Sequence, residues 1–354
     1  MKKKFFDVVF ILGLCFLFIL SLAATRSEAA LEISGLVETE FGYVSEEESG
    51  TKRSVSDVTL ATVEIGLDAD ICESVKGNVV LLWEEDETEE VVVDSGTITI
   101  ANEEKCPFSL TIGRMFVPFG NFATHFISDP FTLELGETSE SALLFGYTKG
   151  LTSFSLGFCN GDISETDSSD DDMINTFVMN LTFDIQSDNM PITFGVGYIT
   201  NIADTDAMQS IATDDDTGTN YPYVDSSVGG LNVFLTSKSG PFTLEAEYIQ
   251  AMSEFESGDL GLGTLDGKKP GAWNVELAYE VSERLEIAGK YEQTMDQEDI
   301  PDAFESRFGV AASYGLYDAT TLGVEILNST GYEPAGGGDE DTATSITAQL
   351  AIEF

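Results

Sequence analysis

Apolar residues recur at every second position through most of the chain, which is the pattern of β-strands with one apolar and one polar face. In the first such run Val37 and Phe41 share a face, whereas Glu38 and Glu40 lie on the opposite one. The pattern predicts sixteen strands, over residues 33–43, 59–67, 75–83, 98–101, 108–116, 141–148, 151–159, 177–183, 192–198, 229–236, 242–248, 273–281, 285–291, 306–314, 320–327 and 346–354. The weaker runs leave room for about 14 to 18 strands.

The polar faces of these strands carry glutamate and glycine, and no charged residue falls on the apolar face of the clearest runs. A transmembrane barrel needs this arrangement, because one face meets lipid and the other meets water. Closure of the sheet also removes the free edges that lipid does not tolerate. We therefore expect an all-β fold, a transmembrane antiparallel β-barrel of about 16 strands of the porin type. A soluble β-sandwich is the alternative fold.

Short and long connections alternate along the chain, as the short periplasmic turns and long outer loops of outer-membrane barrels do. The predicted short connections are 149–150, 185–190, 237–240, 282–284 and 315–319. The predicted long acidic connections are 44–55, 159–173, 200–227, 251–270 and 328–344. Aromatic residues near strand ends predict two interfacial girdles. They are Tyr43, Trp83, Tyr198, Tyr248, Trp273 and Tyr291 at the outer ends, and Tyr279, Tyr314 and Phe354 at the inner ends.

The first 29 residues have the features of a secretory signal peptide. A basic start at Lys2, Lys3 and Lys4 precedes an apolar run over 8–24 and a small-residue exit at 27–29. We expect residues 1–29 to be removed and residues 30–354 to form one barrel domain. No later segment has the ~18 consecutive apolar residues of a spanning helix, so the exported chain would cross a membrane as strands or remain soluble.

The composition excludes several classes of function. Lys and Arg number 16 against 63 Asp and Glu, a formal net charge of −47, which excludes nucleic acid as a partner because phosphate binding needs clustered bases. The one histidine, His125, lies within five residues of Ser128 and Asp129. A triad needs these groups on separate, fixed elements, so no enzymatic activity is expected.

The polar faces of the strands would line the interior of the barrel. The predicted lining residues are Glu38, Glu40, Glu64, Lys76, Glu245, Glu247, Glu276, Glu280, Lys290 and Arg307, with Asp68, Glu84, Glu286, Glu292, Glu325 and Glu353 on the same faces. An acidic wall attracts cations and repels anions. A barrel of this size is wide enough to hold water, so we expect a cation-preferring channel. A plugged or purely structural barrel is the alternative.

Residues 117–140 form a connection that is longer and more apolar than its acidic neighbours, with Phe119, Phe126 and Phe131. Such an apolar loop is not expected to lie bare in water, so we predict that it folds inward and narrows the pore. The polar residues predicted to line this constriction are His125, Asp129, Glu134, Glu137 and Glu140. Arg114 precedes the loop on the lipid-facing side of its strand, and a β-bulge at Gly113 would turn it inward to join them.

Two smaller features admit additional chemistry. Cys72 and Cys106 both fall in predicted inner turns, and the oxidising periplasm would allow a disulfide between them. No cofactor is expected, but the acidic stretch 162–172 would allow weak binding of a divalent cation in an outer loop. It lacks the glycine turn and the terminal glutamate of an EF-hand loop, so a solvated acidic loop is the alternative.

The segment GRMFVPFGNFATHFISDPFTLELGETSES, residues 113–141, resembles the one typical of siderophore porins of the legiobactin-uptake (LbtU) type. ISGLVETEFGY at 33–43, SDVTLATVEIGLDAD at 56–70 and KPGAWNVELAYE at 269–280 match the same family. The resemblance covers nearly the whole mature chain. It implies a barrel of the bacterial outer membrane that passes iron-chelate complexes or other small solutes without an energy-coupling plug.

From the residue pattern and from the family resemblance we expect passive uptake of small solutes, with iron-siderophore complexes as one candidate cargo. A general cation-selective porin is the alternative among channels. A non-conducting surface barrel that acts as an adhesin or stabilises the envelope is the alternative of another class. The expected partners are outer-membrane lipid, lipopolysaccharide and the solutes themselves. Sixteen-strand porins are often trimers, and the sequence leaves a homotrimer open.

Overall fold

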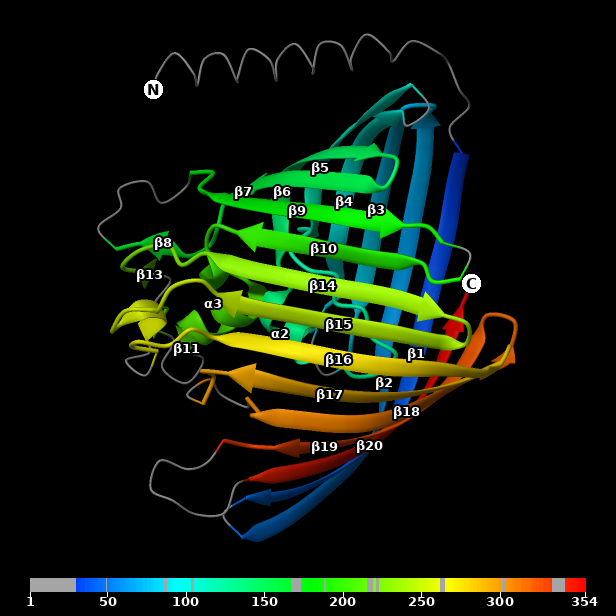
Figure 1. The fold of residues 1–354 in the computed structure, drawn as a ribbon, viewed down its shortest axis with the longest axis vertical. Helices are drawn as coiled ribbons and strands as arrows, with labels where there is room; N and C mark the ends of the chain where they lie inside the picture. Colours follow the sequence, from blue (N-terminus) through cyan, green and yellow to red (C-terminus); the bar gives the residue numbers. More distant parts are fainter. Residues whose placement is uncertain are drawn as a thin grey trace.

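The computed structural model describes residues 30–354 except 49, 86–87, 89, 103–104, 167–172, 188, 215–218, 221–222, 262–264, 299, 301–302 and 333–340. The predicted signal peptide, 1–29, lies outside the described residues. Sixteen strands form one closed antiparallel barrel, in which each pairs with its neighbours in the chain and the first pairs with the last (Figure 1). The predicted fold class and strand number are therefore confirmed.

The barrel strands follow the predicted runs closely. In chain order they are β1 (Ala30–Glu48), β2 (Thr51–Cys72), β3 (Val75–Trp83), β4 (Val92–Asn102), β5 (Cys106–Phe116), β6 (Ser139–Lys149), β7 (Thr152–Cys159), β9 (Thr176–Ile185), β10 (Ile192–Ile199), β14 (Gly230–Ser239), β15 (Phe242–Ala251), β16 (Gly271–Ser282), β17 (Leu285–Met295), β18 (Ser306–Tyr317), β19 (Thr320–Thr330) and β20 (Thr342–Glu353). β1 closes the barrel against β20, and the backbones of Gly35 and Phe354 exchange two hydrogen bonds of 2.8 and 3.0 Å.

The smaller elements all lie in the long connections. They are β8 (Ser164–Glu165), β11 (Thr213–Asp214), β12 (Thr219–Asn220), β13 (Tyr223–Val224), the helices α2 (Phe131–Gly136) and α3 (Asp206–Ala212), and the 3-10 turns η1 (Ile202–Asp204) and η2 (Asp259–Gly261). Among the described residues, no helix is long and apolar enough to cross a membrane. Figure 1 shows α3 and β13 near the strand ends that carry the long connections, whereas α2 lies midway along the strands.

One predicted loop is a hairpin instead. Residues 44–55 continue β1 and β2, which pair without interruption up to Glu48 and Thr51. Acidic residues on both faces resemble a loop in sequence, but a hairpin that has water on both sides accepts them equally well. A register shift between Glu38 and Glu40 also reverses the facing of β2 from Thr59 back to Thr51. Thr59 therefore pairs with Glu40 and faces the interior, although the simple alternation predicts that it faces outward.

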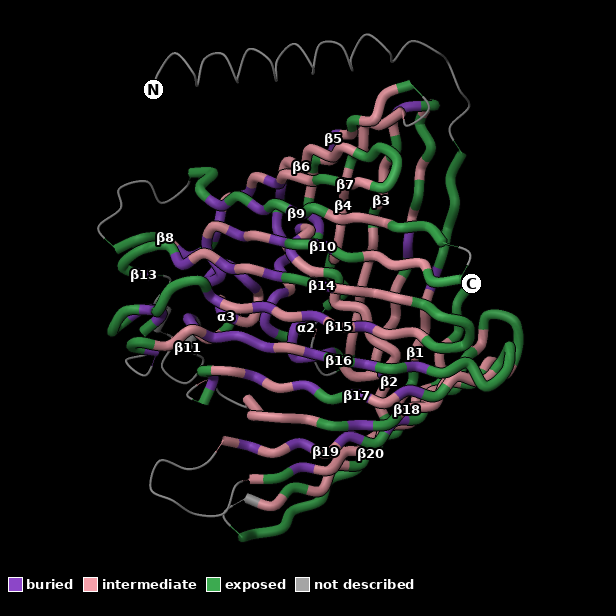
Figure 2. The backbone as a smooth tube through the Cα atoms, in the orientation of Figure 1, coloured by how far each residue is buried: buried purple, intermediate pink, exposed green. Residues whose placement is uncertain are grey.

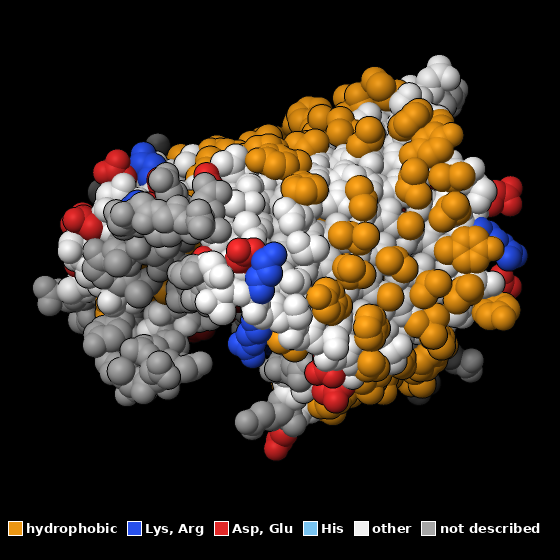
Figure 3. Space-filling model, turned by 90° about the horizontal axis from the view of Figure 1, so that it is seen from below, with side chains coloured by type: hydrophobic (Ala, Val, Ile, Leu, Met, Phe, Trp, Pro, Cys, Tyr) orange, Lys and Arg blue, Asp and Glu red, His pale blue; other side chains and the backbone are white. Residues whose placement is uncertain are grey.

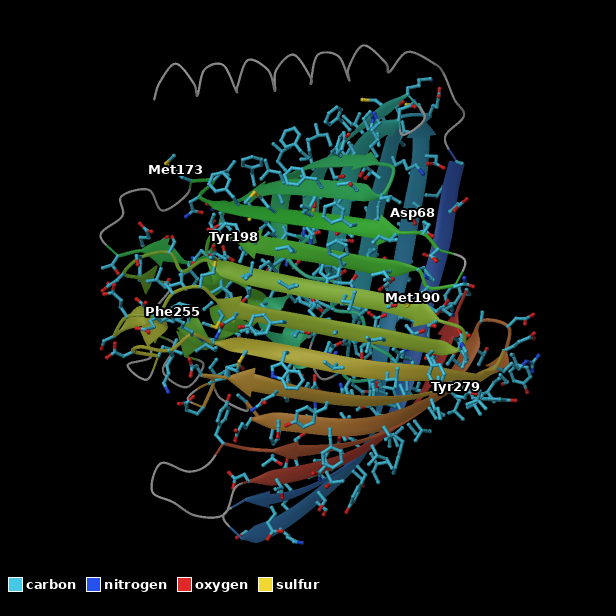
Figure 4. All side chains as sticks on the ribbon, in the orientation of Figure 1. Asp68, Met173, Met190, Tyr198, Phe255 and Tyr279 are labelled. Carbon is cyan, nitrogen blue, oxygen red and sulfur yellow. The ribbon has the colours of Figure 1, made fainter. Side chains whose placement is uncertain are left out.

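The exterior of the barrel is apolar, as the alternation predicts. Side chains such as Phe41, Ile65, Leu277 and Val310 are 41–59% exposed, and apolar side chains cover the wall of the barrel in Figure 3. In a β-sandwich these side chains would pack against each other in a dry core, so the sandwich alternative is wrong. Figure 4 places Tyr198 and Tyr279 toward opposite ends of the strands, which is consistent with two girdles.

The largest buried apolar cluster lies under the long connections. It joins the connection between β5 and β6 to η1, α3 and η2 through side chains such as Phe119, Ile202, Met208 and Leu260, each at most 1% exposed. Figure 2 shows this burial concentrated at the ends of β9–β16 that bear these connections, whereas the opposite ends are exposed. The main apolar core thus lies at one end of the barrel, beneath the long connections.

The predicted disulfide between Cys72 and Cys106 is wrong. Both thiols, and that of Cys159, are free. Cys72 ends β2 and Cys106 begins β5, with β3 and β4 between them. Three strand spacings of ~4.8 Å place the two strands ~14 Å apart, and a disulfide needs Cα atoms within ~7 Å.

The expected bulge at Gly113 is also absent, because the β4–β5 register is continuous from Gly96–Arg114 to Ala101–Ser109. Gly113 instead adopts a φ of 139°, a backbone conformation that L side chains rarely take. A Cβ atom there would lie 2.0 Å from the carbonyl oxygen of Gly96. This position therefore requires glycine.

Gly113→Ala is expected to destabilise the barrel by about 1–3 kcal/mol, because alanine would strain the backbone and clash with β4. The measurement is the temperature at which folded protein loses its distinct migration in SDS gels. Gly77→Ala in β3 is the matched control, because the nearest atom to its added Cβ is 3.9 Å away. Equal loss of stability in both variants would contradict the assignment.

Candidate functional site: a pore constriction lined by carboxylates

The connection between β5 and β6, residues 117–138, lies inside the barrel against the wall formed by β15–β19; we call it the inward loop. Its backbone and side chains bond to inward-facing residues of β15, β16, β17, β18 and β19. The apolar side chains of Phe119, Phe131 and Leu135 are 0–4% exposed. Burial of these apolar side chains explains why the connection does not extend into water.

Four glutamates of the barrel wall accept hydrogen bonds from the backbone of the inward loop. The bonds run from Asn121 and Phe122 to Glu247 (2.8 and 2.7 Å), from His125 to Glu276 (2.7 Å), from Ile127 and Ser128 to Glu325 (2.8 and 3.1 Å) and from Phe131 to Glu292 (2.9 Å). Three of them, Glu276, Glu292 and Glu325, are at most 1% exposed. Buried carboxylates need such donors, because an unpaired buried charge is very costly.

The two inward-facing cations of this wall are paired as well. The Arg307 guanidinium donates to Glu292, forms an ion pair with Glu134 at 3.2 Å and donates to the carbonyl oxygen of Asp129 at 2.5 Å. The Lys290 ammonium lies 3.2 Å from Glu292. Both positive charges are therefore balanced by carboxylates beside the inward loop.

A cavity of about 410 Å³ lies between the inward loop and the adjoining wall of β1, β2 and β20. Its lining residues are Glu38, Glu40, Thr59, Ala61, Thr62, Glu84, Glu85, Ile127, Asp129 and Gln349. Five of these ten residues are carboxylates, and the described part of the lining includes no lysine or arginine. The Gln349 amide donates to Glu40 at 2.8 Å, and Glu85 accepts the Leu60 amide at 2.6 Å. This part of the interior is thus strongly negative.

The residues predicted for the constriction divide into three groups. Asp129 lines the cavity. The His125 Nδ1 atom lies 2.8 Å from Glu286 on the wall, and Glu134 pairs with Arg307, so both face the anchored side of the loop. Glu137 and Glu140 lie farther out near α3, and Glu140 belongs to β6 rather than to the loop.

The residues predicted to line the lumen also divide. Glu38 and Glu40 line the cavity, whereas Glu247, Glu276, Lys290 and Arg307 are occupied beneath the inward loop. Glu245 is buried and accepts the Thr236 hydroxyl at 2.5 Å. Glu64 lines a second cavity of about 490 Å³ with Phe354. Lys76 and Glu280 form exposed ion pairs with Asp70 and Lys238, at 3.4 and 2.6 Å.

The interior wall is therefore not uniformly acidic and exposed, because the inward loop covers some of its carboxylates. The expectation is wrong for Glu247 and Glu276, because a carboxylate covered by a loop must take hydrogen bonds from that loop. Sequence reasoning also missed Glu85 and Gln349 as cavity residues. Glu85 is the second residue after the alternating run that ends at Trp83, next to the predicted lining residue Glu84, and that adjacency was the available signal.

Carboxyl groups also gather near α3, outside the strands. Burial raises the pKa of Asp204 to about 6, although it accepts the Thr176 hydroxyl at 2.5 Å and the Ile163 amide at 3.0 Å. Burial, with repulsion from Asp206 as the next cause, raises the pKa of Glu137 to about 7. Burial raises the pKa of Asp206 too, and the hydrogen bond from the Ser139 amide and the positive charge of Arg114 partly offset this. Without the bulge at Gly113, Arg114 is exposed on β5 and does not join the predicted constriction.

Among the described residues, no group of three or more His, Cys, Asp or Glu side chains could hold a metal ion. Much of the acidic stretch 162–172 lies outside the described residues, since 167–172 are not among them. Weak divalent binding in that outer loop therefore stays a prediction.

Comparison with known proteins yields distant relatives. No family model matches the chain. A UPF0422 protein of Coxiella burnetii is 28% identical over 212 residues, which cover 58% of this chain and 44% of that protein. A UPF0422 protein of Legionella pneumophila is 25% identical over 241 residues, which cover 62% and 44%. The chain thus matches less than half the length of these curated relatives.

Solved structures show the same fold. The outer membrane channel DcaP of Acinetobacter baumannii has a TM-score of 0.63 at 14% identity, covering 93% of this chain and 99% of that one. An anion-selective porin from Comamonas acidovorans has a TM-score of 0.64 at 12% identity, covering 92% and 100%. OmpT of Vibrio cholerae has a TM-score of 0.59 at 12% identity, covering 94% and 99%. The chain therefore has a porin-like sixteen-strand barrel.

Glu137→Gln is expected to stabilise the protein at about pH 8 and to leave it unchanged at about pH 4. A carboxyl group whose pKa rises from 4.5 to about 7 on folding loses stability as the pH rises through that window. The folded state binds the proton more tightly, and the amide cannot ionise. The measurement is the unfolding temperature in detergent at both pH values.

Glu254→Gln, in the exposed connection after β15, is the control and should shift neither unfolding temperature. If Glu137→Gln changes the unfolding temperature equally at both pH values, ionisation of Glu137 is not the cause.

Proposed function

We propose that this protein is a passive channel of the bacterial outer membrane that prefers cations. The observation that carries the proposal is the cavity of about 410 Å³, which is lined by Glu38, Glu40, Glu84, Glu85 and Asp129 and, as far as the structure describes its lining, by no lysine or arginine. Solutes that cross the barrel would pass this acidic cavity. Fixed charges in a narrow water-filled space concentrate ions of the opposite sign.

The strength of the attraction between these carboxylates and a passing cation depends on the distance between the charges. Two unit charges at 4 Å interact by about 1 kcal/mol in bulk water and by several times more near a protein wall. Salt screens such charges beyond ~10 Å at 0.1 M. Charges at the outer rim would therefore contribute little, and the carboxylates of the cavity would decide the selectivity.

An apolar exterior supports residence in a membrane, and the fold is the one found in outer-membrane porins. Removal of residues 1–29 as a signal peptide belongs to the proposal, as does contact with outer-membrane lipid and lipopolysaccharide. OmpT of Vibrio cholerae was solved in a trimer form, at a TM-score of 0.56 to this chain. We extend that state to this chain as a proposed homotrimer.

The solute class follows from charge and from the resemblance to siderophore porins. An acidic cavity favours neutral or cationic complexes over anionic ones. Iron-siderophore complexes of that kind are the proposed specific cargo, and a general cation-selective porin is the simpler form of the proposal. Uptake of labelled neutral and anionic ferric chelates by cells with and without the protein separates the two forms.

A non-conducting barrel that acts as an adhesin or stabilises the envelope is the competing function. The clustered acidic outer connections are the feature that favours it. Folded protein in a planar bilayer discriminates between the classes, because discrete current steps require an open pore. Their absence from verified folded protein would favour the surface barrel.

The double variant Glu38→Gln, Glu40→Gln is expected to lower the ratio of K⁺ to Cl⁻ permeability by about threefold or more, because two charges leave the constriction. The ratio is measured from the reversal potential in a KCl gradient. Wild-type protein should show a potential of the sign set by cations.

The matched control is Glu46→Gln, Glu254→Gln, which removes the same charge far from the cavity and should leave the ratio unchanged. An anion preference in the wild type, or equal effects of the two double variants, would refute the assignment.

A further inference from the structure

We propose that Glu247, Glu276, Glu292 and Glu325 are positioning residues, which set the width of the pore by holding the backbone of the inward loop. The proposal deepens the channel function proposed above and rests on it. It divides the acidic interior into two sets with different roles. One set anchors the loop, and the other faces the passing solute.

The first observation is that both oxygens of Glu247 and of Glu276 are occupied by donors. One oxygen of Glu247 accepts the Asn121 amide and the side-chain amide of Asn232, both at 2.8 Å, and the other accepts Phe122.

Glu276 repeats this arrangement. One of its oxygens accepts the hydroxyl of Thr124 at 2.7 Å and the side-chain amide of Asn274 at 3.0 Å, and the other accepts the His125 amide. Wall asparagines thus complete the coordination that the loop begins.

The other two anchors follow the same rule. One oxygen of Glu325 accepts the Ile127 and Ser128 amides, and the other accepts the Ser128 hydroxyl. One oxygen of Glu292 accepts Phe131, and the other faces Arg307 and Lys290. A glutamine at Glu247, Glu276 or Glu292 would set its NH₂ group against an N–H donor, whereas at Glu325 the Ser128 hydroxyl could accept from it. The first three sites therefore require carboxylates and discriminate against their closest isostere.

The second observation is that the loop contributes mainly peptide groups to these bonds. Six backbone N–H groups, between Asn121 and Phe131, reach the four glutamates. Backbone donors survive most side-chain substitutions, so the docking of the loop depends on the wall more than on the loop sequence. The side chain of Asn121 is exposed and offers a direct comparison.

The third observation is that the loop covers one set and leaves the other beside the cavity. Glu325 lies on β19 beneath the loop, whereas Glu38 and Glu40 lie two strands away on β1, where they line the cavity and Gln349 binds Glu40. Release of the loop would widen the passage and expose four additional carboxylates. Loss of an anchor is therefore expected to change conductance without weakening cation preference.

Glu325→Ala is the principal test, because all three of the donors to Glu325 come from the loop and alanine accepts none of them. In single-channel recordings the time spent in a wide, high-conductance state is expected to rise about tenfold or more, since charged hydrogen bonds are lost. Cation preference should persist. Asn121→Ala is the loop-side control and should behave as wild type, and Glu38→Gln, Glu40→Gln should alter the permeability ratio at normal conductance.

A reversible disulfide between the loop and the wall tests positioning directly, because a general loss of stability would not be reversed by it. A Cβ atom at Gly323 on β19 would lie 3.2 Å from the Ile127 side chain, so Ile127→Cys with Gly323→Cys can join loop and wall. In the Glu325→Ala background, oxidation of this pair should restore the narrow state, and dithiothreitol should reverse it. The Ile127→Cys change alone is the control for oxidation.

The outcomes separate this proposal from the channel function. Normal conductance in folded Glu325→Ala and in Glu247→Gln, an independent anchor at the other end of the loop, would overturn the positioning role. If Glu325→Ala does not fold, Glu247→Gln decides alone. A wild-type pore without cation preference would refute the proposed selectivity, while a redox-reversible change of conductance in the locked variant would still support the positioning role.

Discussion

A peptide group finds no hydrogen-bond partner in hydrocarbon, and this constraint shapes the whole molecule. A wall of strands can cross a bilayer only as a closed ladder, and here β1 completes the ladder against β20. Closure forces the two faces of every strand to differ, because one meets lipid and the other meets the interior. The sixteen-strand circumference in turn leaves an interior too wide for side chains to fill, so a loop and water must occupy it.

The inward loop and the acidic wall satisfy each other's hydrogen-bonding groups. A loop inside a barrel has peptide N–H groups without a strand partner, and a glutamate covered by that loop has lost its water. Glu276 and Glu325 satisfy several loop donors each at distances near 2.7–3.1 Å. Charge-assisted bonds of this kind are stronger than neutral ones. The loop is thus held by charge against a wall that would otherwise repel itself.

The strands were predictable because period-two alternation is local, as in 273–281, where Trp273 and Val275 oppose Asn274 and Glu276. The inward loop was predictable because a connection with several phenylalanines is not expected to extend into water. The role of each interior glutamate was not predictable, because Glu40 and Glu325 look alike in sequence and differ only in whether the loop lies over them. The hairpin over 44–55 and the facing of Thr59 depend on register, which a single shift reverses.

Net charge does not by itself decide what a barrel passes, since the fold is shared with an anion-selective porin. The sign depends on which charges face the constriction after pairing. Arg307 and Lys290 both point inward, yet Glu292 and Glu134 hold them beneath the loop. The anchoring network therefore does more than position the loop. It withdraws the cations of this wall from the passage, and among the described residues that line the cavity between the inward loop and β1, the charged ones are all carboxylates.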